Sequence, residues 1–255
     1  MEKDQKTFLM TDIHAHLLYG FADGASDCDT CCRMLELYAA GGVKRVVCTS
    51  HSQSASGSKY DECFARAGEL AQDFGITLIP ALEYSLPDVL AGQDRPLGNG
   101  QYLLLDPGMT PVEPSLFTRL MPLNATGNKF LWAHPERLYP DRVIRTVDQF
   151  AILAGSACQL NSGSFTGNFG TGAKDAAWEL LTNGHCAVIG SDAHSPEEVA
   201  DFIKLRQMLA QFYPDEFIRL WFETNPERIL SGKTPERRMP PPLTFIQKLK
   251  LALFH

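Results

Sequence analysis

Most of the histidines in this sequence stand directly after stretches that it predicts to be β-strands. They are His14, His16, His51, His134 and His194. Four carboxylates end such stretches or lie close to these histidines: Asp23, Glu83, Asp106 and Asp192. Imidazole and carboxylate together suit Mn²⁺, Fe or Zn²⁺, whereas a structural zinc site would use cysteine thiolates, which the short histidine motifs lack. We therefore predict a metal centre.

Two of these motifs have a spacing that directs both side chains to the same side of a strand. One residue separates His14 from His16, and one separates Asp192 from His194. Side chains alternate in direction along a strand, so residues two apart point the same way. In a parallel barrel the carboxyl ends of all strands open onto one face. Residues far apart in the chain would then meet at that face.

Short apolar runs alternate with longer amphipathic stretches along the chain. The runs predict strands at Phe8–Ile13, Arg45–Thr49, Thr77–Leu82, Tyr102–Leu105, Phe130–Ala133, Ala157–Leu160 and Ala187–Gly190. The stretches predict helices at Cys28–Ala40, Asp61–Phe74, Ser115–Met121, Val143–Ala154, Ala173–Asn183, Pro196–Leu209 and Asp215–Glu223. This alternation indicates βαβ units and a parallel sheet. It favours an α/β fold, and seven strands favour a TIM-like barrel, with a doubly wound open sheet as the alternative.

The composition is that of one globular domain. The chain has 255 residues, of which 44% are apolar and 21% charged. Its formal net charge of −7 would repel a phosphate backbone, so we expect no nucleic-acid partner. A phosphorylated substrate is still possible, because bound cations reverse the local charge.

The cysteines and the first residues bear on location. Seven cysteines, an odd number, and a polar opening segment without signal-peptide character indicate reduced thiols and a cytoplasmic protein. Cys28 and Cys31 have the spacing of half a zinc site, but no second pair completes it. We interpret them as small helix residues packed in the interior.

Two polar segments predict loops on the same face as the metal centre. Ser52–Lys59 follows the second predicted strand, and Asn161–Gly172 follows the sixth. The second segment is rich in glycine but lacks the lysine of a P-loop. It either contacts a phosphate-bearing substrate or is a plain flexible connection.

The end of the chain differs from the rest. Residues 1–236 carry the predicted barrel, whereas residues 237–255 begin with a proline-rich linker. The linker leads to an apolar, lysine-bearing segment, Leu243–His255. Such a segment either packs on the barrel as a helix or makes a weak contact with a partner or a membrane surface.

The motifs together resemble those of a known superfamily. The segments that carry the resemblance are TDIHAHLLYGFADG, GGVKRVVCTSHS, AHPERLYP, NSGSFTGNFG and NPERIL. They resemble the polymerase and histidinol phosphatase (PHP) superfamily, and most closely the manganese-dependent protein-tyrosine phosphatases of bacterial capsule and exopolysaccharide loci. The resemblance implies a distorted (β/α)₇ barrel with three divalent metal ions, Mn²⁺ being expected and Fe or Zn²⁺ being the alternatives.

The resemblance also implies a ligand set for each ion. The first ion would bind His14, His16, Glu83 and Asp192, the second Glu83, Asp106 and His134, and the third Asp23, His51 and His194. Arg137 matches the family's His-x-Glu-Arg arginine and is expected to bind phosphate. With Glu83 and Asp192, it completes the expected catalytic set.

This sequence departs from the family's pattern in two places. Asp106 stands where the family usually has Glu, and its side chain is one methylene shorter. After His194 the family commonly has a substrate-binding arginine, whereas this chain has Glu197 and Glu198. Arg206, on the next predicted helix, is the candidate replacement.

These expectations describe a metal-dependent phosphomonoesterase, a protein-tyrosine phosphatase. By resemblance, its substrate is the phosphotyrosine tail of a membrane-anchored bacterial tyrosine kinase that controls polysaccharide export. No Cys-x5-Arg loop follows a predicted strand, so a cysteine nucleophile is poorly supported. The alternatives are a phosphoesterase for a small ester such as histidinol phosphate or for a phosphodiester, and a non-catalytic module that binds kinase tails.

Overall fold

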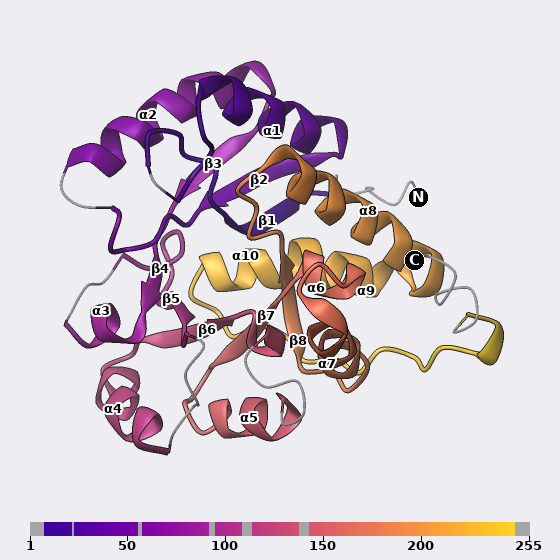
Figure 1. Cartoon of the computed structure of the whole chain (residues 1–255). Helices are drawn as coiled ribbons and strands as arrows, with labels where there is room; N and C mark the ends of the chain where they lie inside the picture. Colours follow the sequence, from indigo (N-terminus) through magenta and orange to yellow (C-terminus); the bar gives the residue numbers. More distant parts are fainter. Residues whose placement is uncertain are drawn as a thin grey trace, which may run out of the picture.

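The strands of this protein run parallel and lie in two sheets (Figure 1). The computed structural model describes residues 8–21, 23–55, 58–91, 95–108, 114–137 and 143–247. Its strands are β1 (Met10–Ala15), β2 (Val43–Cys48), β3 (Thr77–Pro80), β4 (Glu83–Ser85), β5 (Tyr102–Asp106), β6 (Lys129–Ala133), β7 (Ala157–Asn161) and β8 (Cys186–Gly190). The first sheet has the order β1-β2-β3, and the second runs from β4 to β8 in chain order. The predicted α/β class is confirmed.

The two sheets meet just after the carboxyl ends of β2 and β8, at the first residue of β4 and the last residue of β1. On one side, His51 after β2 forms an isolated parallel bridge with Glu83 of β4. On the other side, Ala15 of β1 forms one with Ala193 after β8. The sheets therefore close into a distorted barrel, and the closing contacts lie beside the predicted metal ligands.

The prediction of one continuous strand over Thr77–Leu82 is wrong, and the described residues hold eight strands instead of seven. The hydroxyl of Tyr60, a buried residue of the preceding helix Ser58–Asp73, lies at the break. It lies 2.8 Å from the carbonyl oxygen of Cys48 and 3.0 Å from that of Ala81, whose N–H donates to it at 3.0 Å. Glu83 therefore begins a strand of the second sheet instead of ending the third strand.

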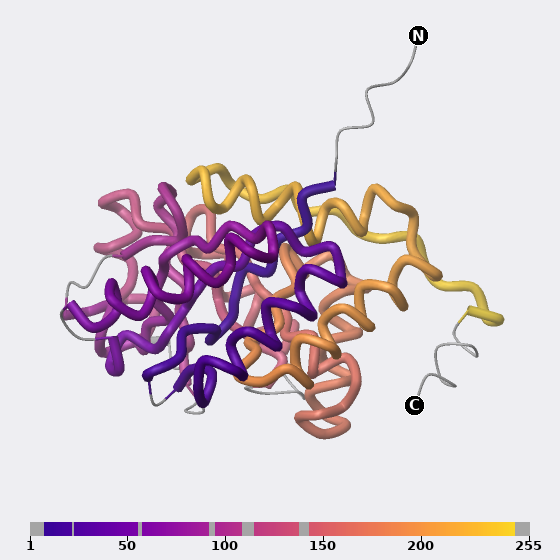
Figure 2. The backbone as a smooth tube through the Cα atoms, turned by 90° about the horizontal axis from the view of Figure 1, so that it is seen from above, coloured from indigo at the N-terminus to yellow at the C-terminus, as the bar shows by residue number. Residues whose placement is uncertain are grey.

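Helices surround the two sheets. They are α1 (Cys28–Ala40), α2 (Ser58–Asp73), α3 (Leu86–Leu90), α4 (Pro114–Ala125), α5 (Val143–Phe150), α6 (Ser162–Thr166), α7 (Gly170–Thr182), α8 (Pro196–Phe212), α9 (Asp215–Arg219) and α10 (Asn225–Leu230), with a 3₁₀ turn η1 (Pro135–Arg137) and a π-helical segment η3 (Leu220–Thr224). The Asp27 carboxylate caps α1 by accepting a hydrogen bond from Thr30 N at 2.7 Å. Outside the first sheet, α1 lies between α2 and α8 (Figure 2). Across the described ranges, no helix is both long and apolar enough to span a membrane.

Apolar side chains pack in two clusters, one inside the barrel and one outside it. Leu104 and Leu131 belong to the inner cluster, whereas their strand neighbours Phe130 and Trp132 belong to the outer one. This alternation follows from the two-residue period of a strand. The outer cluster packs against the helices, as where Trp132 stacks on Phe150 of α5 with ring centroids 3.7 Å apart. Apolar side chains thus fill the barrel interior, and Ile229 and Leu230 of α10 belong to the same inner cluster.

The glycine-rich segment after β7, predicted as a loop, is mostly helical, so that prediction is wrong. Asn161 caps α6 by accepting a hydrogen bond from Gly163 N at 2.7 Å, and Gly167 ends it with φ +90°. The buried carboxylate of Glu136 accepts hydrogen bonds from Asn161 N at 2.8 Å and from Ser164 Oγ at 2.7 Å. These contacts with another element make the segment helical.

Of Cys28 and Cys31, only Cys31 lies in the interior. Cys31 is buried, and burial raises the pKa of its thiol to about 12. Cys28 is exposed, because it is the first residue of α1 and faces away from the core. The expectation that both pack inside is wrong for Cys28. All seven cysteines are free thiols.

Two predicted segments lie partly outside the described residues. Residues 56 and 57 of Ser52–Lys59 and residues 248–255 of Leu243–His255 are among those outside. In the described part of the tail, Leu243 packs partly against the outer cluster. Phe245 and Ile246 are 81% and 66% exposed. The tail's helix packing, its contact with a partner and the boundary at residue 237 stay predictions.

Candidate metal centre

Four side-chain atoms from three parts of the barrel surround one point. They are His14 Nε2, His16 Nε2, Glu83 Oε2 and Asp192 Oδ1. The two imidazole nitrogens are 3.2 Å apart, and each lies 3.1–3.4 Å from both carboxylate oxygens. Atoms bound tetrahedrally to one ion at about 2.0–2.1 Å would be about 3.3–3.4 Å apart. These five separations are close to those expected of ligands to a single ion, and all four atoms lie within 4.8 Å of one another.

The ends of three strands position these side chains. β1 supplies His14, and His16 follows its last residue; Glu83 begins β4. Asp192 follows β8 and has φ +55°, and His134 after β6 has φ +35°. They are the non-glycine residues with positive φ in the described chain, a conformation that costs on the order of 1 kcal/mol or more. Such strain gathers at functional sites.

Two further groups of possible ligands adjoin the first. In one, Asp23 Oδ2 lies 3.4 Å from His16 Nδ1 and 3.2 Å from His51 Nδ1. In the other, Glu83 and Asp106 join His134, whose Nε2 is 3.3 Å from Glu83 Oε1. Glu83 thus directs one oxygen to the first group and one to this group. Its buried Oε1 has no hydrogen-bond partner, which fits an oxygen that binds a cation.

His194 lies beside the group in which the resemblance placed it, with its ring centroid 6.4 Å from that of His51, although its ring nitrogens do not join the ligand atoms of Asp23 and His51. Its ring stacks on His16 with centroids 4.1 Å apart and planes 10° apart. Its Nδ1 is 2.9 Å from the carbonyl oxygen of Asp192. His16, rather than His194, is the imidazole that the structure brings to Asp23 and His51.

A glutamine that the motifs did not single out orients the first histidine. Gln159 Oε1 lies 3.0 Å from His14 Nδ1. If Nδ1 donates to this oxygen, the lone pair of Nε2 is free for an ion, as is usual for metal-binding histidines. The available sequence signal was a glutamine within an otherwise apolar predicted strand. Gly190 allows this contact, since a Cβ there would lie 3.0 Å from His14 Cβ and 3.1 Å from Gln159 Nε2.

A buried carboxylate ties the ends of β1 and β8 together. Asp12 Oδ2 accepts a hydrogen bond from Tyr38 OH at 2.6 Å, and Asp12 Oδ1 accepts from Ser191 N at 3.0 Å. Burial raises the pKa of Asp12, although these hydrogen bonds lower it. The contact fixes the strand that carries His14 beside the turn that carries Asp192. These partners lie on α1 and just after β8, so the motifs did not reveal the contact.

Arg137 contacts the same carboxylate that faces the histidines. Its Nη2 donates to Asp192 Oδ2 at 2.8 Å, and Asn161 Nδ2 donates to the same oxygen at 3.1 Å. Asp192 thus uses Oδ1 toward the two histidines and Oδ2 toward these two donors. The Nε of Arg137 is buried and has no hydrogen-bond partner. Arg206 is elsewhere, 5.3 Å from the ring of Phe8 before β1, so it does not replace the missing arginine.

The carboxylates and histidines hold each other in their charged forms. Burial opposes protonation of His14, but Glu83 and Asp192 raise its pKa to about 10. Hydrogen bonds with Asp23 and Glu83 raise the pKa of His51 to about 9. Despite burial, the neighbouring histidines keep the pKa of Glu83 and that of Asp192 well below their usual values. Divalent cations would take the place of these protons, because metal ligands must be deprotonated.

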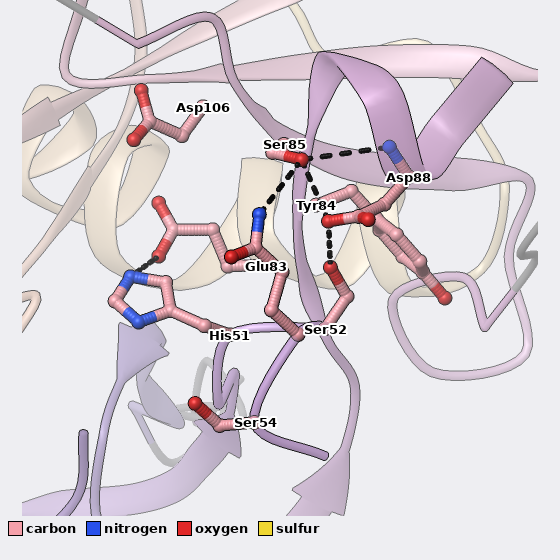
Figure 3. Close-up of a pocket in the computed structure, with 9 residues that line it drawn as sticks. His51, Ser52, Ser54, Glu83, Tyr84, Ser85, Asp88 and Asp106 are labelled. Carbon is pink, nitrogen blue, oxygen red and sulfur yellow. Dashed lines mark hydrogen bonds and ion pairs between the residues drawn. The ribbon is translucent and has the colours of Figure 1, made fainter. Parts of the chain in front are cut away.

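A polar cavity of about 260 Å³ opens beside the centre (Figure 3). His51, Glu83 and Asp106 line the side toward the centre. On the other side, Ser52 Oγ and Ser85 Oγ each donate to Asp88 Oδ2 at 2.6 Å. The space could hold a small substrate group next to the candidate ligands.

A parallel α/β barrel with buried histidines and carboxylates at its carboxyl end defines a metal-binding barrel of the PHP type. Residues 10–231 match the model of a family described as capsular polysaccharide synthesis, CpsB/CapC. The chain belongs to this family, which confirms the resemblance of its motifs.

Comparisons with individual proteins agree with this family assignment. Tyrosine-protein phosphatase YwqE of Bacillus subtilis (strain 168) is 24% identical over 197 residues, 73% of this chain and 78% of YwqE. A chain from the crystal structures of YwqE and of CpsB from Streptococcus pneumoniae, described as unique metal-dependent tyrosine phosphatases, has a TM-score of 0.69 and 22% identity over 92% of this chain and 100% of that chain. A variant of organophosphorus hydrolase from Deinococcus radiodurans has a TM-score of 0.58 and 13% identity over 88% and 93%. These structural matches confirm the distorted TIM-like fold.

Proposed function

We propose that this protein is a metal-dependent phosphomonoesterase that acts as a protein-tyrosine phosphatase. The observation that carries the proposal is the set of four ligand atoms at the mouth of the barrel, in which each histidine nitrogen lies 3.1–3.4 Å from the other three atoms. Membership of the CpsB/CapC family and the similarity to YwqE support the same activity.

Three divalent ions are proposed, with Mn²⁺ as the first choice and Fe or Zn²⁺ as alternatives. His14, His16, Glu83 and Asp192 would hold one; Glu83, Asp106 and His134 a second; and Asp23 and His51 a third, with His16 or His194. Such ions supply positive charge for phosphoryl oxygens and activate water. Imidazole with carboxylate favours these metals over Mg²⁺.

Arg137 is the proposed phosphate-binding residue. Its contact with Asp192 uses Nη2, and the buried Nε lacks a partner. A guanidinium has five donors in a planar fork, so it can hold Asp192 and a phosphoryl oxygen at once. Asp192 orients Arg137 through one oxygen and faces the histidines with the other.

The proposed substrate is the phosphotyrosine tail of a membrane-anchored bacterial tyrosine kinase of a capsule or exopolysaccharide locus, met in the cytoplasm. Family membership supports this assignment. The acidic net charge of −7 is unfavourable for a nucleic acid.

One observation favours a second candidate, a small phosphate ester such as histidinol phosphate. The cavity beside the centre carries hydroxyl and carboxylate groups of Ser52, Ser85 and Asp88, which suit a polar leaving group. An aryl group would gain less from these contacts.

The test is to compare substrates on one metal-loaded preparation. A phosphotyrosine peptide, histidinol phosphate and a phosphodiester should be assayed for kcat/KM. We expect the phosphotyrosine peptide to be hydrolysed best. Preference for histidinol phosphate or for the phosphodiester would replace the tyrosine-phosphatase proposal, and binding of the peptide without turnover of any substrate would indicate a non-catalytic module.

A further inference from the structure

An exposed phenylalanine lies against the proposed phosphate-binding arginine. Phe169 directly precedes α7, and 44% of it is exposed. The Cζ atom of Arg137 lies 3.6 Å from the centroid of its ring. Only 18% of the Arg137 side chain is exposed. An aromatic ring this close to a guanidinium attracts its charge and covers one flat face.

The turn between α6 and α7 holds the ring in place from behind. A Cβ on Gly163 would lie 3.0 Å from Phe169 Cε2, so the ring packs directly on the backbone of α6. The neighbouring Asn168 donates from its backbone N to Gly163 O at 3.0 Å and from Nδ2 to Asp201 Oδ2 at 3.0 Å. The ring is therefore supported by α6 and, through Asn168, by α8.

Arg137 is thus constrained in two directions. Asp192 accepts a hydrogen bond from Nη2 in the guanidinium plane, and Phe169 lies against its face. An arginine side chain has many rotamers, and fixing it in one of them costs conformational entropy. With both contacts the guanidinium is already ordered before a phosphate binds.

We propose that Phe169 is a positioning residue that holds the Arg137 guanidinium in the orientation in which its free donors face the metal centre. The inference rests on the proposed role of Arg137 in binding phosphate. The glycine-rich turn then has a function. The turn supplies a fixed aromatic surface for an arginine instead of binding phosphate through its own backbone.

The test is a double-mutant cycle on the metal-loaded full chain with a small aryl phosphate. The variants are Phe169→Ala, Phe169→Leu, Phe169→Trp, Arg137→Ala and the double variant Phe169→Ala/Arg137→Ala. Each is assayed for kcat, KM, metal content and Tm. Phe245→Ala is the matched control, since Phe245 is 81% exposed and lies away from the centre.

We expect Phe169→Ala to lose about tenfold in kcat/KM with metal content unchanged, a size in keeping with a desolvated cation–π contact. Phe169→Trp should restore most of the loss, whereas Phe169→Leu should not, because it lacks a π face. The double variant should match Arg137→Ala within about twofold, because Phe169 acts through Arg137. Phe245→Ala should match the unmodified protein.

Three results would overturn this inference alone. If Arg137→Ala loses activity but Phe169→Ala does not, the positioning role is wrong and the proposed function stands. If the two losses add in the double variant, Phe169 acts independently of Arg137. If Phe169→Leu is as active as Phe169→Trp, ordinary packing suffices. Full activity of Arg137→Ala would instead contradict its proposed role in binding phosphate, and the inference would fall with it.

Discussion

Asp192 contacts both the candidate metal-binding histidines and the proposed phosphate-binding arginine. Its Oδ1 is 3.1 Å from His14 Nε2 and 3.2 Å from His16 Nε2, while its Oδ2 accepts from Arg137 at 2.8 Å. A charge-assisted hydrogen bond of this kind is short and strong. The proposed metal site and the proposed phosphate-binding arginine therefore share a single carboxylate.

Substitution of Arg137 should separate phosphate binding from metal binding. Arg137→Ala should keep its metal and lose on the order of 10²-fold in kcat/KM, about 3 kcal/mol, because it removes a donor fork for the phosphate. Arg137→Lys should recover little, since an ammonium cannot reproduce the fork. Arg206→Ala is the matched control and should keep its turnover, because Arg206 lies against Phe8, away from the centre. Unchanged turnover of Arg137→Ala with metal intact would refute the proposed role of Arg137 in binding phosphate.

The second residue-scale prediction concerns pH. The pKa of His14, about 10, and that of His51, about 9, lie above the ordinary 6.5, so protonation favours the folded, metal-free protein. This contribution is fully present below pH 6.5 and is lost as the pH rises through 9 and 10. The Tm of metal-free protein should therefore fall between pH 7 and pH 10. Metal-loaded protein should show a smaller fall, because its ligands carry no such protons. Parallel curves for the two forms would contradict this.

At the residue scale the sequence was informative where the signal is local. His14, His16, Asp192 and the other candidate ligands stand in short motifs at strand ends. Gln159 and Phe169 were missed because they meet their partners only in the fold. Gln159 is 145 residues from His14 in the sequence, and Phe169 meets Arg137, which lies on another turn. The position of His194 was also not predictable, because its stacking on His16 depends on how the turn after β8 packs.

At the scale of elements, the close approach of β1, β7 and β8 places the first histidine. Gly190→Ala would put a Cβ 3.0 Å from His14 Cβ and 3.1 Å from Gln159 Nε2. We expect a loss of about 1–3 kcal/mol in stability and weaker metal binding, because a packed site accepts no added methyl group. Gly68→Ala in α2 is the control, since nothing lies within 4 Å of its added Cβ, and its Tm should not fall. Equal Tm and metal affinity for both variants would show that the site has room to adjust.

Most elements were predictable because their apolar periodicity and caps are local, as for Cys28–Ala40, which the structure reproduces. The break before Glu83 was not, because the Tyr60 hydroxyl that occupies it comes from α2. The helix α6 lies in a glycine-rich segment that predicts a loop, and the Glu136 carboxylate that supports the helix lies on another element. Contacts between elements, rather than local propensity, determine the structure both at the break before Glu83 and in α6.

At the scale of the whole molecule, the catalytic proposal needs the barrel but not the tail. Phe245 and Ile246 are largely exposed, and residues 248–255 lie outside the described chain. Truncation after Arg238 should therefore leave kcat/KM for a small aryl phosphate within about twofold of the full chain, while action on a membrane-bound kinase falls. A collapsed fold, seen as a lost thermal transition, would show that the tail belongs to the core.

The central claim is that phosphate ester hydrolysis depends on divalent ions held at the mouth of the barrel. The most direct measurement is turnover of a phosphotyrosine peptide by protein whose metal content is determined before and after exhaustive chelation. We predict no turnover without metal, and recovery with Mn²⁺ that exceeds recovery with Mg²⁺, because imidazole ligands favour the softer ion. Full turnover in a preparation verified to be free of metal would contradict the account.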